Sequence, residues 1–378
     1  MTNKERIMII LQHKEADRVP LDLGVAGACQ ISLVLYKKLL DYFGIKEDII
    51  CSNKISQMAL ASDKFLQKLE CDVRSPFPLH VLPNPPREWE DQDGFFIQDS
   101  WGAISRMPKE KGYYYDLVEP PMAGSLDDDS KTYNFPPIPD IAPKAVEQAK
   151  AYQEAGYPVI LPDPYGNGFL QTATRVYGYE DWMMMLALDD KRTDWFMETL
   201  LENKLKYYDK VAAAFGDSVD IVLEMDDLGT QIGPFIDPEM VRKKLKPYYR
   251  KLYDYIHKVV KAKVFMHSCG SVVKMIPDLI EAGVDILNPV QISAAGMDPA
   301  YLKKEFGKDL VFWGGGIDTQ VILPSGTKQQ IRDMVKRNVE IFGKDGGFVF
   351  ATIHNAQPDV PVENFIAMWE AFKECRNY

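Results

Sequence analysis

The segment Lys263-Val264-Phe265-Met266-His267-Ser268-Cys269-Gly270 decides the fold that we expect. It begins with a short apolar run, and such a run ahead of a glycine is typical of a buried strand. The run leads into His267 and Cys269, two side chains that bind borderline-soft metal ions, just before Gly270, where the chain is expected to turn. The segment therefore predicts a strand whose carboxyl end carries metal ligands.

Similar runs recur on both sides of this segment. In the second half of the chain, strands are expected at 220–224, 263–267, 284–288, 310–313 and 347–351. Helical patterns such as 238–260 and 327–342 alternate with them, which indicates repeated strand–helix units around a parallel sheet. Further strands are expected upstream at 19–23, 72–74 and 159–161. These eight expected strands predict an α/β fold, a (β/α)8 TIM barrel with an N-terminal extension and insertions.

Residues from about 72 to 143 break this rhythm. The stretch is rich in proline, aspartate and aromatic residues and shows little clean periodicity. We interpret it as a long insertion or lid, and residues 1–378 as a single barrel domain. Its aromatic residues either wall a pocket for an aryl ring or belong to an ordinary core. The candidates among them for such a wall are Phe95, Phe96, Trp101, Tyr113, Tyr114 and Tyr115.

Length, charge and cysteine usage exclude several classes of protein. With 378 residues, 46% of them hydrophobic, the chain can bury a large core. Its net charge of −11 argues against nucleic acid and anionic membrane surfaces as partners. No apolar run approaches the roughly 20 residues that a membrane-spanning helix needs, and the start resembles an amphipathic helix rather than a secretion signal. The five cysteines are widely spaced and indicate reduced thiols, so we expect a cytoplasmic protein.

The candidate site residues follow from the barrel, because active sites of such barrels lie where the strands end. His354 follows the last expected strand, so it should reach the same layer as His267 and Cys269. Two imidazoles, a thiolate and one carboxylate form a ligand set that suits Zn²⁺. Glu224 and Asp226 both stay open as the source of the carboxylate.

Some of these residues also have ordinary structural interpretations. A His-x-Cys pair alone is a weak motif, and its position after a strand is what favours a metal site. Asp226 and Asp227 are either site carboxylates or the capping and loop acids of the following helix. Gly314-Gly315-Gly316 lacks the spacing and the lysine of a phosphate-binding loop, which favours a tight turn.

Five motifs together resemble the uroporphyrinogen decarboxylase superfamily, in its corrinoid-dependent zinc methyltransferase branch (O-demethylase methyltransferase I-like). The motifs are Asp226-Asp227-Leu228-Gly229-Thr230-Gln231, His267-Ser268-Cys269-Gly270, Asn288-Pro289-Val290-Gln291, Gly315-Gly316-Ile317-Asp318-Thr319-Gln320 and Val360-Pro361-Val362-Glu363-Asn364. The resemblance spans essentially the whole chain and is strongest from Tyr177 onward. It implies a (β/α)8 barrel, in agreement with the strand pattern.

The branch is chosen by the chemistry of its motifs. The decarboxylase typically carries a motif like Arg-Gln-Ala-Gly-Arg-Tyr, whose arginines hold a polycarboxylate, and it uses no metal. This chain has Leu21-Asp22-Leu23-Gly24-Val25-Ala26-Gly27 instead. The zinc methyltransferases carry His-x-Cys and a third ligand, usually Cys, just before a Pro-x-x-Pro-x-Glu-Asn segment. Residues 358–364 match that segment, and the third ligand position falls on His354.

An imidazole in place of a thiolate leaves a bound zinc more electrophilic, which favours polarising the oxygen of a methyl ether over activating a thiol. We therefore expect a zinc-dependent methyltransferase that moves a methyl group from a small methoxylated, aromatic substrate to cob(I)alamin. The cobalamin is expected on a separate corrinoid protein, since nothing in the chain resembles the Asp-x-His-x-x-Gly cobalamin-binding loop. The expected catalytic residues are Asp226, Asp227 and Gln291, with Asp227 or Gln291 orienting the substrate.

Two other functions stay open. One is a methylcobalamin:thiol methyltransferase, in which the methyl group moves in the opposite direction. The other is a metal-free member that acts as a decarboxylase or as a binding partner of a corrinoid protein, and metal content distinguishes it from the rest. The oligomeric state also stays open, although barrels of the family that the chain resembles commonly pair as homodimers.

Overall fold

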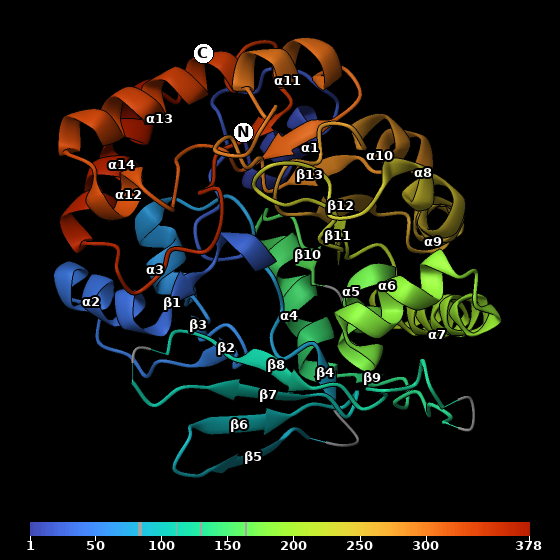
Figure 1. Ribbon diagram of the computed structural model, residues 1–378. Coiled ribbons are helices and arrows are strands. Elements are labelled where there is room, and N and C mark those ends of the chain that lie inside the picture. Colours follow the sequence, from blue (N-terminus) through green and yellow to red (C-terminus); the bar gives the residue numbers. More distant parts are fainter. Residues whose placement is uncertain (82–84, 111, 129–130, 163–164) are drawn as a thin grey trace.

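The computed structural model describes residues 1–81, 85–110, 112–128, 131–162 and 165–378. Its main sheet is parallel and has six strands in the order β10-β11-β12-β13-β14-β15, of which Figure 1 labels β10 to β13. The strands are β10 (Ile160–Leu161), β11 (Ile221–Met225), β12 (Lys263–His267), β13 (Ile286–Asn288), β14 (Val311–Trp313) and β15 (Phe348–Val349). Nearly all of their residues are buried, as expected for a parallel sheet that is covered on both faces.

Single bridges continue the sheet at both of its edges. Leu21 pairs in parallel with Phe350, just after β15, and Arg74 pairs in parallel with Val159, just before β10. The backbone N–H of Asp72 donates to the carbonyl of Leu21 at 2.9 Å. The structure therefore confirms a mixed α/β fold with a parallel half-barrel, and each strand expected from the sequence corresponds to a strand or to a bridge.

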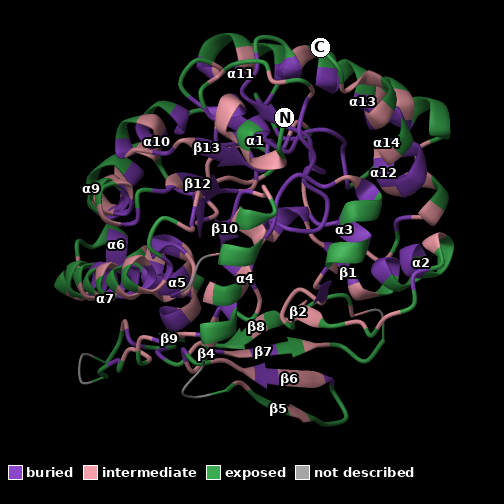
Figure 2. Ribbon diagram, turned by 180° about the vertical axis from the view of Figure 1, so that it is seen from behind, coloured by how far each residue is buried: buried purple, intermediate pink, exposed green. Residues whose placement is uncertain are grey.

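Helices cover the outer side of this sheet (Figure 1). Figure 2 shows β12 and β13 as buried, whereas long stretches of α4 and α7 are exposed. The helices are α1 (Asn3–Ile10), α2 (Leu33–Phe43), α3 (Asp63–Leu69), α4 (Pro143–Glu154), α5 (Phe169–Tyr177), α6 (Tyr179–Ala187), α7 (Lys191–Phe215), α8 (Pro238–Met240), α9 (Lys246–Tyr255), α10 (Ile276–Ala282), α11 (Pro299–Phe306), α12 (Ile322–Ser325), α13 (Lys328–Gly343) and α14 (Val362–Cys375). None that the structure describes is both long enough and apolar enough to span a bilayer.

Capping residues explain where several helices begin. Thr327 accepts from the backbone N–H of Gln330 and forms a capping box at the start of α13. The helical pattern expected at 238–260 is less regular, because two π-helical turns, η2 (Val241–Leu245) and η3 (Ile256–Val260), flank α9. Pro247 lies in the first turn of α9 and has no N–H for the preceding turn, which gives a physical reason for the first irregularity.

The stretch 72–143 contains an antiparallel sheet that the sequence analysis did not predict. Its strands are β5 (Arg87–Glu90), β6 (Phe95–Gln98), β7 (Ile104–Met107) and β8 (Asp116–Glu119), paired in that order. β4 (His80–Val81) pairs with β9 (Asp140–Ile141) and brings the two ends of the stretch together. Most residues of β5 to β8 are half-buried or exposed, so neither face produces a clear apolar alternation.

A small sheet and a short helix lie in the N-terminal part of the chain. The sheet has the order β1-β3-β2, with β1 (Ile31–Ser32), β2 (Cys51–Asn53) and β3 (Met58–Ala59). The short 3₁₀ helix η1 (Gly27–Cys29) follows the segment around Leu21. These elements lie next to the ends of the central strands, where the candidate site is found.

Candidate metal centre

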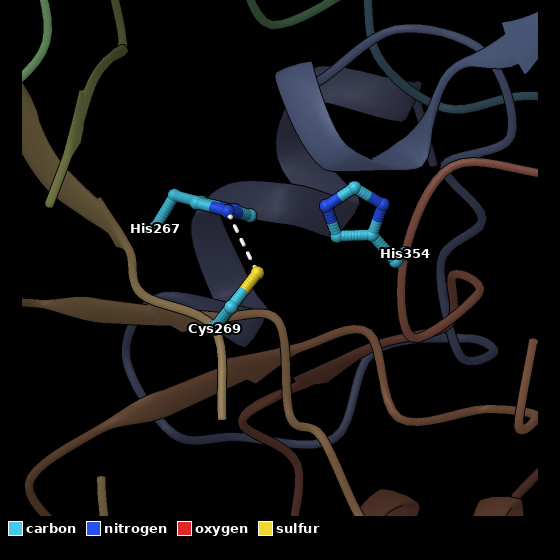
Figure 3. Close-up of side chains that lie close together, drawn as sticks. All are labelled: His267, Cys269 and His354. Carbon is cyan, nitrogen blue, oxygen red and sulfur yellow. Dashed lines mark hydrogen bonds between the residues drawn. The ribbon is translucent and has the colours of Figure 1, made fainter. Parts of the chain in front are cut away.

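Three side chains that the sequence marks as metal ligands lie close together (Figure 3). β12 ends at His267, Cys269 follows two residues later, and His354 comes after β15. Their ligand atoms all lie within 4.8 Å of one another, and Nε2 of His267 is 3.4 Å from Sγ of Cys269. Nitrogen and sulfur ligands of one tetrahedral zinc are about 3.5 Å apart, so the donor set and its spacing fit this metal.

Asn288 at the end of β13 selects the nitrogen of His267 that faces the cluster. The amide nitrogen of Asn288 donates to the carbonyl of Trp313 at 2.8 Å. Its oxygen Oδ1 is therefore the atom that accepts from Nδ1–H of His267, also at 2.8 Å. Nε2 of His267 then carries a lone pair and points toward Cys269, which is the usual arrangement of a metal-binding histidine.

Burial controls the protonation of the other two ligands. Burial lowers the pKa of His354 to about 4, and the neighbouring His267 adds to the effect. His354 is therefore a neutral imidazole near pH 7, with a lone pair that a metal can use. Burial also raises the pKa of the Cys269 thiol well above its usual value, and the negative charge of Asp227 contributes. A cation bound here would favour the thiolate, because metal binding displaces the thiol proton.

Asp227 lies beside the cluster. Its Oδ1 accepts from the backbone N–H of Cys269 at 2.8 Å and is 3.6 Å from Nε2 of His267. Its Oδ2 accepts from the side-chain amide of Gln171 at 2.7 Å. The sequence predicted Asp227 as a site residue, whereas no motif marks Gln171, which is brought here by the first turn of α5.

Asp226 points away from the three ligands. Its two carboxylate oxygens accept from the backbone N–H groups of Leu170 at 2.8 Å and Gln171 at 2.7 Å. The hydroxyl of Tyr249 donates to it as well, at 2.6 Å. Asp226 thus caps the start of α5, which precedes it in the sequence, rather than a helix that follows it.

Glu224 is also directed away from the cluster, toward α7. It accepts from Nζ of Lys204 at 2.9 Å and from the hydroxyl of Tyr208 at 2.6 Å, and all three are buried. Side chains alternate along a strand, so Glu224 and Met225 face opposite sides of the sheet. The structure does not bring Glu224 or Asp226 to the three ligands, and Asp227 is the expected site carboxylate that lies beside them.

Two glycines press the loops after β11 and β12 against each other. A Cβ added at Gly270 would lie 2.4 Å from the carbonyl carbon of Gly229, and one at Gly229 would lie 2.6 Å from the carbonyl oxygen of Cys269. Gly270 also has a φ of +83°, and its N–H donates to Oε1 of Gln291 at 2.6 Å. This close contact positions the backbone that carries Cys269.

A cavity of about 480 Å³ opens in front of the cluster and is lined by Cys269, His354 and Gln291. Tyr113 and Tyr114 reach it from the stretch 72–143. Two other aromatic residues of that stretch contact aromatic partners that do not line this cavity: Trp101 contacts Tyr165 and Phe135, and Phe96 stacks on Trp89. The expected aromatic wall is therefore present only in part.

The chain is similar to known proteins in sequence and in fold. Residues 168–375 match the family described as uroporphyrinogen decarboxylase (URO-D). Among solved structures, a methyltransferase from Methanosarcina mazei is similar over 99% of both chains, with 19% identity and a TM-score of 0.65, which shows a shared fold. A 3-keto-D-glucoside 4-epimerase from E. coli has 10% identity and a TM-score of 0.37, over 61% of this chain and 83% of that one. No curated protein sequence matches the chain.

Proposed function

Because this chain belongs to the uroporphyrinogen decarboxylase (URO-D) family, we propose that it is a zinc-dependent methyltransferase of that family. It moves a methyl group from a methoxylated substrate to the cob(I)alamin of a separate corrinoid protein. The observation that carries the proposal is the convergence of His267, Cys269 and His354 within 4.8 Å. The fold that the chain shares with a methyltransferase over its whole length supports the reaction class.

The proposal includes a closed (β/α)8 barrel. The bridges at Leu21 and Arg74 and the hydrogen bond between Asp72 and Leu21 lie between the two edges of the central sheet. The side chain of Asp72 also accepts from the backbone N–H of Leu21 at 2.7 Å. A closed barrel would put the ends of eight strands on one face, together with the metal centre.

The ligands suit one direction of methyl transfer. His267, Cys269 and His354 would hold the zinc, which when bound would act as a Lewis acid on the ether oxygen of the substrate. Two neutral imidazoles and one thiolate neutralise less of the metal charge than two thiolates would. The methyl group would leave the ether oxygen, which keeps the bonding electrons and takes a proton from water, while cob(I)alamin supplies the electron pair of the new cobalt–carbon bond.

Asp227 and Gln291 would orient the substrate in front of the ligands. The side chain of Asp227 is 38% exposed, and its Oδ1 is already held by the backbone N–H of Cys269. Gln291 lines the cavity in front of the cluster, and its Oε1 accepts from the backbone N–H of Gly270. The corrinoid protein would approach over this cavity, whose rim includes Tyr113 and Tyr114.

Metal analysis of wild-type protein, purified without chelators, tests the proposal. We expect about one zinc per chain, as in other zinc sites, and its loss in Cys269→Ala and His354→Ala. Cys375→Ala is the matched control. It removes a half-buried cysteine near the C-terminus, outside the candidate site, so the variant protein should keep its zinc. Methyl transfer from methoxylated compounds to cob(I)alamin should follow zinc content across these variants. Wild type without zinc, or full activity after zinc removal, would overturn the proposal.

A further inference from the structure

A second cavity, of about 730 Å³, lies beside the metal centre, between the sheet and the stretch 72–143. It is large enough for an organic ligand. Two residues of its wall neighbour residues that carry or flank the candidate ligands. Met225 lines the cavity and pairs in register with His267. The backbone N–H of Gln30, also in the wall, donates at 2.9 Å to Oδ1 of Asn355, the residue after His354.

We infer that this cavity binds the body of the methyl donor and that this donor is an uncharged organic molecule. The inference rests on the proposed function, since it concerns the substrate of that reaction. Its basis is the chemistry of the cavity wall, which distinguishes three classes of donor: carboxylates, quaternary ammonium compounds and uncharged molecules.

The charged side chains of the described wall are already neutralised by partners. Arg74, Asp63 and Asp99 line the wall. Arg74 donates from Nε to Asp63 at 2.7 Å, and Asp99 pairs with Arg175, which lies outside the wall, at 2.5 Å. The remaining charged residue of the wall, Lys54, pairs with Glu88. Burial lowers the pKa of His80 to about 4, so its ring is neutral near pH 7. Nη2 of Arg74 is buried and has no hydrogen-bond partner among the described residues, so it can donate to an uncharged acceptor, whereas the charge of Arg74 is already matched by Asp63. A charged ligand would lose its hydration here and would have to compete with these ion pairs for a counter-charge from the described wall.

The rest of the wall is largely apolar. Leu66, Phe77, Ile97 and Leu223 line it together with several prolines. Its aromatic residues, Phe77 and Tyr152, do not make the multi-sided aromatic cage that binds a quaternary ammonium group. An apolar body with few hydrogen-bonding groups therefore matches this surface best.

Three related probes test the charge preference by isothermal titration calorimetry near neutral pH. They are p-methoxybenzamide, p-methoxybenzoate and p-methoxyphenyltrimethylammonium, of which only the first is uncharged. We expect the benzamide to bind at least about tenfold more tightly than either charged probe, which is about 1.4 kcal/mol. Tighter binding of a charged probe, or no measurable binding of the benzamide, would overturn the inference.

Variants at Gly27 locate the bound probe. A Cβ at Gly27 would meet Leu223 Cδ1 at 3.5 Å, an ordinary contact, so Gly27→Ala should change the Kd by only a few fold. Gly27→Leu adds volume toward the cavity and should weaken binding by about tenfold or more. Met225→Trp blocks the cavity from β11 and serves the same purpose if Gly27→Leu does not fold. An unchanged Kd in a folded blocking variant would also overturn the inference.

The same titrations with Cys269→Ala separate this inference from the proposed function. The cavity wall does not include Cys269, so the benzamide should bind this variant as it binds wild type. If wild type binds the benzamide but contains no zinc and transfers no methyl group, the cavity remains a ligand site and the proposed reaction is overturned. If wild type contains zinc and transfers methyl groups but does not prefer the uncharged probe, the proposed function stands and the inference about the cavity is overturned.

Discussion

At the scale of single residues, one amide decides which imidazole nitrogen of His267 faces the metal centre. Asn288→Leu removes the acceptor for Nδ1–H, so the affinity for zinc should fall by about 10- to 100-fold. Asn288→Asp keeps an acceptor at this position and should bind zinc at least as well as Asn288→Leu binds it. Competition with a coloured zinc chelator measures both affinities.

Asn338→Leu is the matched control for this prediction. Asn338 is buried, and its amide nitrogen donates to the carbonyl of Gly315 at 2.9 Å, in the loop after β14. Both leucine variants lose a buried amide and should be less stable than wild type. Only Asn288→Leu should lose zinc affinity, and an affinity equal to that of wild type would exclude the positioning role of Asn288.

Glu224 provides a second residue-scale prediction. Its ion pair with Lys204 is almost completely buried, with side-chain exposures of 2% and 1%. Glu224→Gln removes the buried carboxylate charge that Lys204 contacts, so the free energy of unfolding should fall by about 3–5 kcal/mol. Urea denaturation measures this loss. Zinc content should stay at the wild-type level, and its loss from the folded variant would restore Glu224 as a candidate ligand.

The proximity of His267, Cys269 and His354 was predictable from the sequence because each follows a short apolar run that is typical of a strand. The hydrogen bonds around them were not. Asp226 and Asp227 are adjacent and chemically identical, yet one caps α5 and the other faces Cys269. Which side of the chain each carboxylate takes depends on helices that pack from elsewhere in the sequence, and no local pattern records that packing.

At the scale of elements, β4 carries a histidine that resists protonation. Burial lowers the pKa of His80 to about 4, whereas an unfolded chain has a value of about 6.5. Between these values the unfolded state binds a proton that the folded state excludes. The stability that neutral His80 contributes is therefore complete above about pH 6.5 and is lost as the pH falls toward about 4.

This predicts how the melting temperatures of wild type and His80→Gln differ. The glutamine does not titrate, so the margin by which wild type exceeds the variant should shrink from about pH 7 to about pH 4.5. The comparison with the variant is needed because other groups also change the stability of both proteins in this pH range. Burial raises the pKa values of Asp22 and Asp226 to about 6, so these carboxyl groups favour the folded state as the pH falls, opposite to His80. Thermal unfolding followed by circular dichroism measures it, and a constant margin would contradict the assignment.

The elements differ in how far the sequence predicts them. β11 and β12 are continuous apolar runs because helices cover the sheet, and their positions were expected to within one residue. The sheet from β5 to β8 was missed, since its half-exposed faces leave no alternation to detect. Propensity and pattern report burial, so an element with little burial leaves little trace in the sequence.

At the scale of the whole molecule, Asp72 ties the N-terminal segment to the sheet. It is fully buried and accepts from Arg6 at 2.7 Å, Arg18 at 2.9 Å and the backbone of Leu21 at 2.7 Å. Asp72→Asn leaves the arginines without their shared counter-charge, so stability should fall by about 3–5 kcal/mol. Asp17 also pairs with Arg6, but its side chain is 42% exposed. Asp17→Asn should therefore lower the free energy of unfolding by about 1 kcal/mol or less.

Urea denaturation of both variants checks this prediction. A larger loss in Asp72→Asn than in Asp17→Asn would show that the buried carboxylate supports the junction between the two edges of the sheet. Equal losses would mean that Arg6 alone matters. The comparison is informative because both carboxylates bond the same guanidinium.

The contact between Gly229 and Gly270 has a consequence for how the protein can change. Alanine at either position forces the two loops apart, because each new methyl group would meet backbone atoms at 2.6 Å or less. Once the loops have separated, the second alanine finds part of the space already open. The double variant should therefore lose less stability than the sum of the two single losses, a coupling expected for residues in contact. The two positions form one mutational unit, and a lineage that lost one glycine would have little reason to retain the other.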